Sequence, residues 1–253
     1  MNTIKTRNIV IGEGMPKICV PIVGKTSAEL MQEVAELANI EVDIVEWRMD
    51  WFDEVESIET VVEMLHELRT ALNNTTLLAT FRSKKEGGEK EVSTAFYTEL
   101  NKAVISTKEA DLIDVELFTG DDSVKDIIAC AKEHGVYVVM SNHDFAKTPA
   151  YEDIIARLTR MQDMNADILK IAVMPQSKND VIELLRATND MHELHAHQPI
   201  ITMSMAGTGA LSRMCGEVFG SSVTFGAAKK ASAPGQMAVQ DLKNVLEIVH
   251  KSI

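Results

Sequence analysis

Cysteine is scarce in this chain of 253 residues, and no two cysteines form a Cys-x-x-Cys pair. The three present, Cys19, Cys130 and Cys215, lie far apart along the sequence. This spacing argues against a disulfide framework and against a thiolate metal site. A reducing compartment fits the sequence best.

Long apolar runs are also missing. The longest, such as residues 136–140, fall well short of the roughly 18 apolar residues that suggest a membrane span. The first apolar cluster, residues 9–11, is too short for the core of a signal peptide. We therefore expect a cytoplasmic protein with no targeting segment and no membrane partner.

Basic residues are in the minority, because 25 Lys and Arg stand against 38 Asp and Glu, for a net charge of −13. The field of such a chain repels nucleic acid, so we expect no nucleic-acid partner. Any anionic ligand must then be held by local cations. The apolar fraction of 45% and the charged fraction of 25% are typical of a globular chain that buries a sizeable core.

No Pro/Gly/Ser-rich linker, low-complexity tract or shift in composition divides the chain. Its length allows two small domains or one large α/β domain, and we favour a single domain over residues 1–253. Residues 1–15 precede the first repeating unit. Within them, residues 7–11 followed by Gly12-Glu13-Gly14 predict a small hairpin that closes one end of the fold.

Short apolar or β-branched runs alternate with longer stretches of helical periodicity along the whole chain. Eight such runs predict strands, at residues 18–23, 43–49, 77–82, 112–118, 137–143, 168–174, 200–205 and 223–227. Alternating strands and helices predict parallel βαβ units, and eight units predict a single (β/α)8 TIM barrel. A doubly wound sheet is the alternative.

Polar residues occur late in several predicted strands, where barrel enzymes place their active sites. Because residues i and i+2 share one face of a strand, Glu46 and Arg48 should both point inward, away from the helices. Further inward positions near strand ends are Thr80 with Arg82, Asp114 with Glu116, Ser141 with His143, and Lys170. These side chains should meet at one end of the barrel.

Lys170 carries the most information, because an ammonium in a strand covered on both sides must find a carboxylate or lose its proton. A neutral buried amine is the nucleophile that forms an imine with a ketone or aldehyde. His143, on the adjacent strand, is placed to act as general acid/base beside such an imine, and Glu86 to orient it. The alternatives are a structural ion pair of Lys170 with Glu46 or Glu116, and a core or rim histidine with a backbone partner.

Arg82 and Arg213 are candidates for binding a substrate carboxylate, because a guanidinium matches its two oxygens. Pairing with acidic neighbours at the rim is the alternative. The glycines of residues 205–209 give a weak phosphate-loop signal or make a tight turn. Residues 229–236, KKASAPGQ, predict a loop that closes over a ligand, or an ordinary connection. Three histidines, at positions 192, 195 and 197, are expected at a solvated helix end rather than on a metal.

With these residues assembled, the sequence closely resembles the type I 3-dehydroquinate dehydratases of the shikimate pathway. The motifs that carry the resemblance are GEGMPKICVPIVG at 12–24, EWRMD at 46–50, TFRSKKEGGE at 80–89, LIDVEL at 112–117, SNHDF at 141–145, KIAVMPQ at 170–176, SMAGTG at 204–209 and SRMCGEVFGSSVTFGAAKKASAPGQ at 212–236. The resemblance covers nearly the whole chain. It implies a (β/α)8 barrel, usually a homodimer, without metal or coenzyme. It also implies a small-molecule substrate, 3-dehydroquinate, which is dehydrated to 3-dehydroshikimate.

The resemblance further implies that Lys170 forms the imine, that His143 moves protons, and that Glu86 pairs with His143. The substrate-binding residues it implies are Arg213 for the carboxylate, Glu46, Arg48 and Arg82 for hydroxyls and positioning, and Ser232 with Gln236 in the closing loop. Asp114 and Glu116 would keep the arginines in place. One departure is Leu169, where the family often has a proline; its backbone N–H should pair within the sheet.

Two other functions are open to the same residues. A class I aldolase or transaldolase would use the same imine on the same fold to cleave a carbon–carbon bond. A catalytically inactive barrel would only bind a polyhydroxy acid or another protein.

Overall fold

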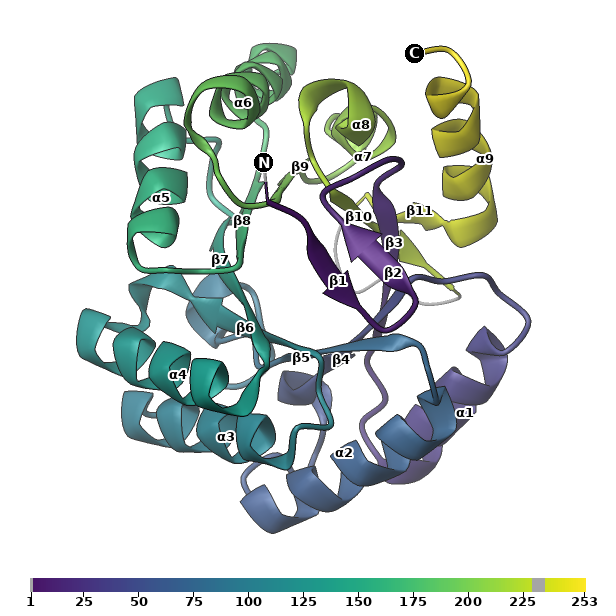
Figure 1. Ribbon diagram of the computed structural model, residues 1–253, viewed down its shortest axis with the longest axis vertical. Coiled ribbons are helices and arrows are strands. Elements are labelled where there is room, and N and C mark those ends of the chain that lie inside the picture. Colours follow the sequence, from purple (N-terminus) through teal and green to yellow (C-terminus); the bar gives the residue numbers. More distant parts are fainter. Residues whose placement is uncertain (1, 229–234) are drawn as a thin grey trace.

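A curled parallel sheet forms the centre of the computed structural model, which describes residues 2–228 and 235–253, and helices surround the sheet (Figure 1). Within the described residues its nine strands run in the order β11-β10-β3-β4-β5-β6-β7-β8-β9. The strands of this sheet are β3 (Lys17–Ile22), β4 (Ile44–Arg48), β5 (Thr76–Thr80), β6 (Leu112–Glu116), β7 (Tyr137–Asp144), β8 (Ile168–Val173), β9 (Ile200–Ser204), β10 (Val223–Ala227) and β11 (Met237–Ala238).

The helices follow the strands in alternation. They are α1 (Ser27–Leu37), α2 (Ile58–Leu72), α3 (Thr94–Thr107), α4 (Asp121–His134), α5 (Tyr151–Asp163), α6 (Lys178–Asp190), α7 (Ala210–Met214), α8 (Gly216–Phe219) and α9 (Val239–His250). Several begin at a hydroxyl residue whose side chain accepts a backbone N–H of the first turn, as Thr26 does for α1 and Ser57 for α2. No helix in the described ranges has the length and apolar character needed to cross a bilayer.

All eight predicted strands are present, and the predicted division of their two faces is confirmed. Val45, Trp47 and Met49 pack with the helices in the larger core, whereas Ile44 lies in a second core on the inner face. This is the two-residue periodicity of an extended backbone. The prediction for Leu169 is confirmed as well, because its N–H donates to the Pro199 carbonyl at 3.0 Å.

The chain also contains elements that the sequence pattern did not predict. The strand β11 pairs with the end of β10, and the short helices α7 and α8 lie between β9 and β10. An isolated parallel β-bridge also joins Ile200, at the start of β9, to Ser221, just before β10. Residues 191–195 form a π-helical turn rather than an ordinary helix end.

The predicted N-terminal hairpin is present. Strands β1 (Ile4–Thr6) and β2 (Ile9–Ile11) pair antiparallel through a turn at Arg7 and Asn8, so the hairpin begins before the predicted residues 7–11, and Gly12-Glu13-Gly14 follows it. Arg7 adopts a left-handed φ of 51°, and its guanidinium is held by Asp111 at 2.6 Å. The hairpin lies across one end of the sheet (Figure 1).

Three isoleucines of the hairpin fix it to the inner core. Ile4, Ile9 and Ile11 are buried with the first inward residues of the strands, among them Ile44 and Leu112. The hairpin therefore closes the amino end of the sheet and leaves the carboxyl end for polar side chains.

Shortening Ile11 to alanine is expected to destabilise the protein by about 2–5 kcal/mol, because the side chain is fully buried and its removal leaves a cavity. Denaturant unfolding of Ile11→Ala against the wild type measures this loss. Lys5→Ala, an exposed change in the same hairpin, is the control and should unfold as the wild type does. Equal stability of the Ile11 variant and the wild type would contradict the closing role of the hairpin.

Candidate active site

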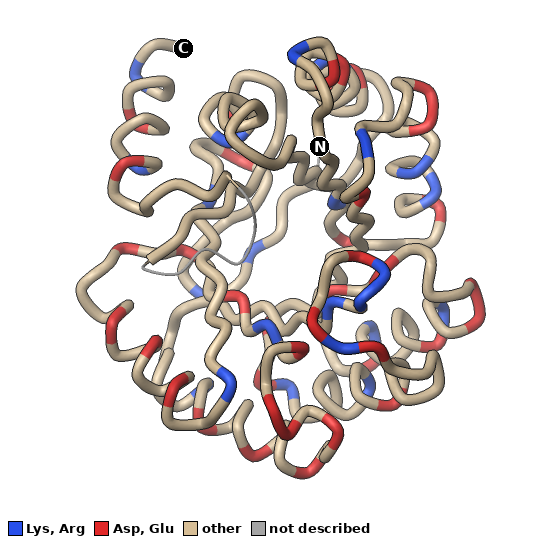
Figure 2. Tube along the Cα trace, turned by 180° about the vertical axis from the view of Figure 1, so that it is seen from behind, with Lys and Arg blue, Asp and Glu red and all other residues tan. Residues whose placement is uncertain are grey.

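A polar cavity lies at the carboxyl end of the sheet, as the positions of the predicted inward residues required. It contains about 500 Å³ of empty space, including its open mouth. Eight of the nine predicted site residues line it, namely Glu46, Arg48, Arg82, Glu86, His143, Lys170, Arg213 and Gln236. The ninth, Ser232, lies outside the described residues. Figure 2, seen from the side opposite to Figure 1, shows basic and acidic segments inside the ring of helices.

Lys170 stands on β8 with only 3% of its surface exposed. Its Nζ lies 3.1 Å from Asp114 Oδ2 and 3.6 Å from Glu46 Oε1. The ring of Phe225, 4.8 Å from Nζ to the ring centroid, covers another side of the amine. The amine is thus held in an ion pair with Asp114 and Glu46. The sequence offered Glu46 or Glu116 as the ion-pair partner of Lys170. Glu46 is close to Nζ, whereas Glu116 pairs with Arg82 instead.

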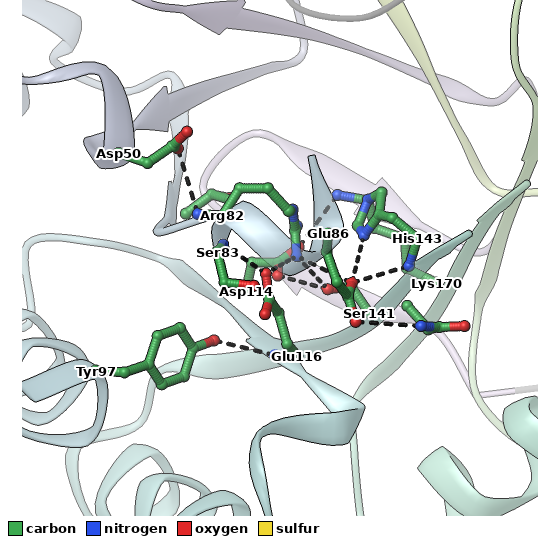
Figure 3. A network of polar contacts seen from close by, with 12 residues as sticks. Asp50, Arg82, Ser83, Glu86, Tyr97, Asp114, Glu116, Ser141, His143 and Lys170 are labelled. Atoms are coloured by element: carbon green, nitrogen blue, oxygen red, sulfur yellow. Dashed lines mark hydrogen bonds and ion pairs between the residues drawn. The ribbon is translucent and has the colours of Figure 1, made fainter. Parts of the chain in front are cut away.

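Arg82 lies at the centre of the acidic residues (Figure 3). Its Nη2 is 2.8 Å from Asp114 Oδ2, and its Nη1 is 2.9 Å from Glu116 Oε1 and 3.0 Å from Ser141 Oγ. Burial alone would raise the pKa of Asp114, but the positive charges of Arg82 and Lys170 outweigh it and lower that pKa. Asp114 therefore remains a carboxylate, and the expectation that Asp114 and Glu116 hold an arginine is met by this geometry.

Arg48 is fixed by a residue that the sequence reasoning missed. Its Nε and Nη2 each donate to Asp50 across 2.8 Å, a two-pronged pair. Asp50 is fully buried and also accepts the backbone N–H groups of Arg82 and Glu89. The signal was present in the motif EWRMD, where Asp50 follows Arg48 at a spacing of two residues.

Glu86 and His143 form a close pair beside Lys170. Glu86 lies in a short 3₁₀ turn (Lys84–Glu86), and its Oε2 is 2.9 Å from His143 Nδ1 and accepts the His143 backbone N–H at 2.8 Å. His143 and Lys170 lie on the neighbouring strands β7 and β8 (Figure 3).

The pair has unusual protonation properties. Burial raises the pKa of Glu86 to about 8, although Arg82 opposes the shift. Burial also lowers the pKa of His143 well below its ordinary value, with the positive charges of Arg82 and Lys170 acting in the same direction. As the pH falls, the proton that the pair binds therefore resides on Glu86, and the imidazole stays neutral.

Arg213 belongs to α7 and lines the cavity. Burial lowers its pKa to about 10, which still leaves it charged at neutral pH. Gln236 lines the same cavity just before β11. In the described part of the chain, no three His, Cys, Asp or Glu side chains are grouped as a metal ion requires.

The cavity combines three chemical functions. A buried amine can attack a carbonyl, a neutral imidazole with a carboxylate partner can move protons, and the guanidinium groups of Arg48, Arg82 and Arg213 can bind a carboxylate or hydroxyl groups. Together they suit a small anionic carbonyl compound.

Comparisons with known proteins agree with one another. The family model of type I 3-dehydroquinase matches residues 18–253. A curated 3-dehydroquinate dehydratase from Listeria monocytogenes is 56% identical over 251 residues, which is 99% of both chains. Another from Clostridioides difficile is 53% identical over 250 residues, covering 99% of this chain and 98% of its own.

A solved structure shows the same arrangement of the chain. Type I 3-dehydroquinate dehydratase from Clostridium difficile, with covalently modified comenic acid, superposes with a TM-score of 0.97 at 53% identity. The match covers 100% of this chain and 99% of the other.

Proposed function

The chain belongs to the type I 3-dehydroquinase family, and we propose that it dehydrates 3-dehydroquinate through an imine on Lys170, with His143 as general acid/base. Its activity is that of a hydro-lyase, which removes water from 3-dehydroquinate to give 3-dehydroshikimate. The observation that carries the residue assignment is the position of the buried Lys170 amine in the cavity that also holds the Glu86–His143 pair.

The proposed reaction begins when the Lys170 ammonium gives a proton to a neighbouring basic group. The free amine then adds to the substrate ketone, and loss of water leaves an imine. The protonated imine draws electrons from the adjacent carbon, whose proton passes to His143 Nε2. The resulting enamine expels the hydroxyl group one carbon further on, and the protonated histidine returns its proton to that oxygen as water leaves. Hydrolysis of the product imine releases the enone and restores the lysine.

The other cavity residues hold the substrate in this proposal. Arg213 binds the substrate carboxylate, because a guanidinium presents two parallel donors. Glu46, Arg48 and Arg82 bind or position the hydroxyl groups, and Gln236 contributes to substrate binding from the cavity wall. The family resemblance adds Ser232, which lies outside the described residues. Asp50 and Asp114 keep Arg48 and Arg82 in their orientations.

We also propose that the curled sheet closes as a (β/α)8 barrel in one domain over residues 1–253, supported by the bridge from Ile200 to Ser221. The family resemblance supports a homodimer. The low cysteine content supports a cytoplasmic location.

Borohydride trapping tests the proposed function directly. The protein is incubated with 3-dehydroquinate, borohydride is added, and the modified peptide is located by mass spectrometry, with Lys170→Met as the matched control. We expect one substrate-dependent adduct on Lys170, and an ultraviolet enone absorbance in the untreated sample. Enone without adduct would keep the reaction and remove the covalent lysine. An adduct formed with a phosphorylated ketose but not with 3-dehydroquinate would favour the aldolase alternative.

A further inference from the structure

Two residues outside the proposed chemistry connect Glu86 to the outer helix α5. Asn142 lies between Ser141 and His143 on β7, and its Nδ2 donates to Glu86 Oε1 at 3.1 Å. Its Oδ1 accepts from Arg157 Nη1 at 2.8 Å. Asn142 is 4% exposed, so the amide that joins the two residues is shielded from solvent.

Arg157 fixes which end of the amide faces Glu86. A guanidinium carries only donors, so it must meet the amide oxygen, and the NH₂ group is then turned toward the carboxylate. Arg157 is itself held in place, because its Nη2 is 2.8 Å from Asp153 and its Nη1 is 3.6 Å from Asp144. Its guanidinium also lies 5.8 Å from the ring centroid of Phe118.

A donor at Glu86 Oε1 favours the ionised form of that carboxyl group. The ionised form accepts Nδ1–H from His143, which leaves the Nε2 lone pair free to take a proton. A protonated Glu86 would instead donate to Nδ1 and leave the hydrogen on Nε2. The orientation of the Asn142 amide thus selects the tautomer of the imidazole.

We propose that Arg157 is a positioning residue which, through the Asn142 amide, favours the carboxylate form of Glu86 and the tautomer of His143 with a free Nε2. The inference rests on the proposed role of the Glu86–His143 pair.

Other charged groups also face this pair, and they act in opposite directions. Arg82, with Nη1 at 3.7 Å from Glu86 Oε2, favours the carboxylate. Burial and the negative charges of Glu116 and Asp114 favour the protonated acid. His143 is influenced by the positive charges of Arg82, Lys170 and Arg48. Because these groups remain in place when α5 is changed, the effect of the amide can be measured separately.

Helix α5 offers a matched control. Arg160 lies on the same helix, 5.7 Å from the same Phe118 ring, and pairs with Asp121 on the surface. The test compares Arg157→Met with Arg160→Met, adds Arg157→Lys as a variant that keeps a donor, and confirms folding by thermal melting. The readouts are the pH dependence of kcat and the ¹⁵N NMR signals of the His143 ring nitrogens. The chain has seven histidines, and the signals of the His143 ring are identified as those that disappear in the His143→Gln variant.

In Arg157→Met we expect the acidic limb of kcat to move up by about one pH unit, which is about a tenfold loss below the limb and little change above it. The His143 signals should shift toward the Nε2–H tautomer at the pH where the wild type carries Nδ1–H. Arg157→Lys should recover part of both effects, and Arg160→Met should show neither. In an Asn142→Ala background, Arg157→Met should cause no further shift.

An unchanged tautomer in Arg157→Met, or a shift that persists at full size in the Asn142→Ala background, would overturn the inference. A changed tautomer with an unmoved kcat profile would support the link from Arg157 to His143 and contradict the proposed catalytic role of the pair. The two proposals can therefore fail separately.

Discussion

Replacing Lys170 by methionine is expected to lower kcat for dehydration by about 10⁴-fold or more, the order of loss that follows removal of a covalent nucleophile. Methionine has similar length and bulk but no amine, so the imine cannot form. Steady-state assays of enone formation, together with the loss of the borohydride adduct, measure the effect.

The fold should survive this change, because the acidic partners of Lys170 keep other contacts. Asp114 remains paired with Arg82 and accepts from Ser141 Oγ at 2.6 Å, and Glu46 accepts from Thr80 Oγ1 at 2.9 Å. Losing the ammonium removes one of the charges that lower the pKa of Asp114. A carboxylate whose pKa is lowered in the folded state stabilises the fold at pH values above its unfolded pKa, and this stabilisation is lost as the pH falls through the folded pKa. With a smaller lowering, the variant should lose this stabilisation sooner on acidification and unfold at a higher pH than the wild type.

A folded Lys170→Met protein with wild-type kcat would rule out the covalent mechanism. If Lys170→Met melts at a temperature far below that of the wild type, its low activity is not informative, and Lys170→Arg becomes the deciding variant. This second variant keeps the positive charge beside Asp114 and Glu46 but cannot form the imine, and it should be equally inactive.

Replacing His143 by glutamine is expected to lower kcat by about 10²–10⁴-fold, the usual contribution of a general acid/base. The glutamine side chain still reaches the Glu86 carboxylate but cannot exchange protons. Because the proposed covalent bond belongs to Lys170, borohydride should still trap a substrate adduct on that residue. Rapid-quench measurement of adduct and enone in one sample separates the two steps.

The pH profile of the wild type follows from the same pair. The base form requires that Glu86 and His143 together have lost their extra proton, and burial raises the pKa of Glu86 to about 8. We therefore expect kcat to rise as the pH increases toward about 8 and to level off above it, whereas His143→Gln should lose this limb. A wild-type profile that is flat between pH 6 and 9, or an unchanged limb in the variant, would contradict the assignment.

Sequence reasoning predicted the strands of the sheet and the direction of their side chains, because both depend on local properties of the chain. An extended backbone sends residues i and i+2 to one face, so Glu46 with Arg48 and Asp114 with Glu116 had to point inward together. The order of the chain then brings the ends of parallel strands to one edge. These two rules were enough to place the polar residues around one cavity.

The partners of those residues were not predictable in the same way. Strand register aligns Lys170 with Ser141, and Ser141 with Glu116, yet the carboxylate 3.1 Å from Lys170 is Asp114. Glu116 is engaged by Arg82 and by the Ser83 backbone N–H at 2.8 Å. Competition between several donors for one acceptor depends on distances across strands, which a linear pattern does not contain.

The sequence by itself determined the alternation of strands and helices, the inward placement of the charged residues and the family to which the chain belongs. The tertiary structure decided the turn of the hairpin at Arg7, the pairing of Arg48 with the buried Asp50, and the link from Arg157 through Asn142 to Glu86. Periodicity is set by neighbouring residues along the chain. A salt bridge or an oriented amide is set by the positions of groups on different elements, and these become defined only when the sheet curls and the helices pack around it.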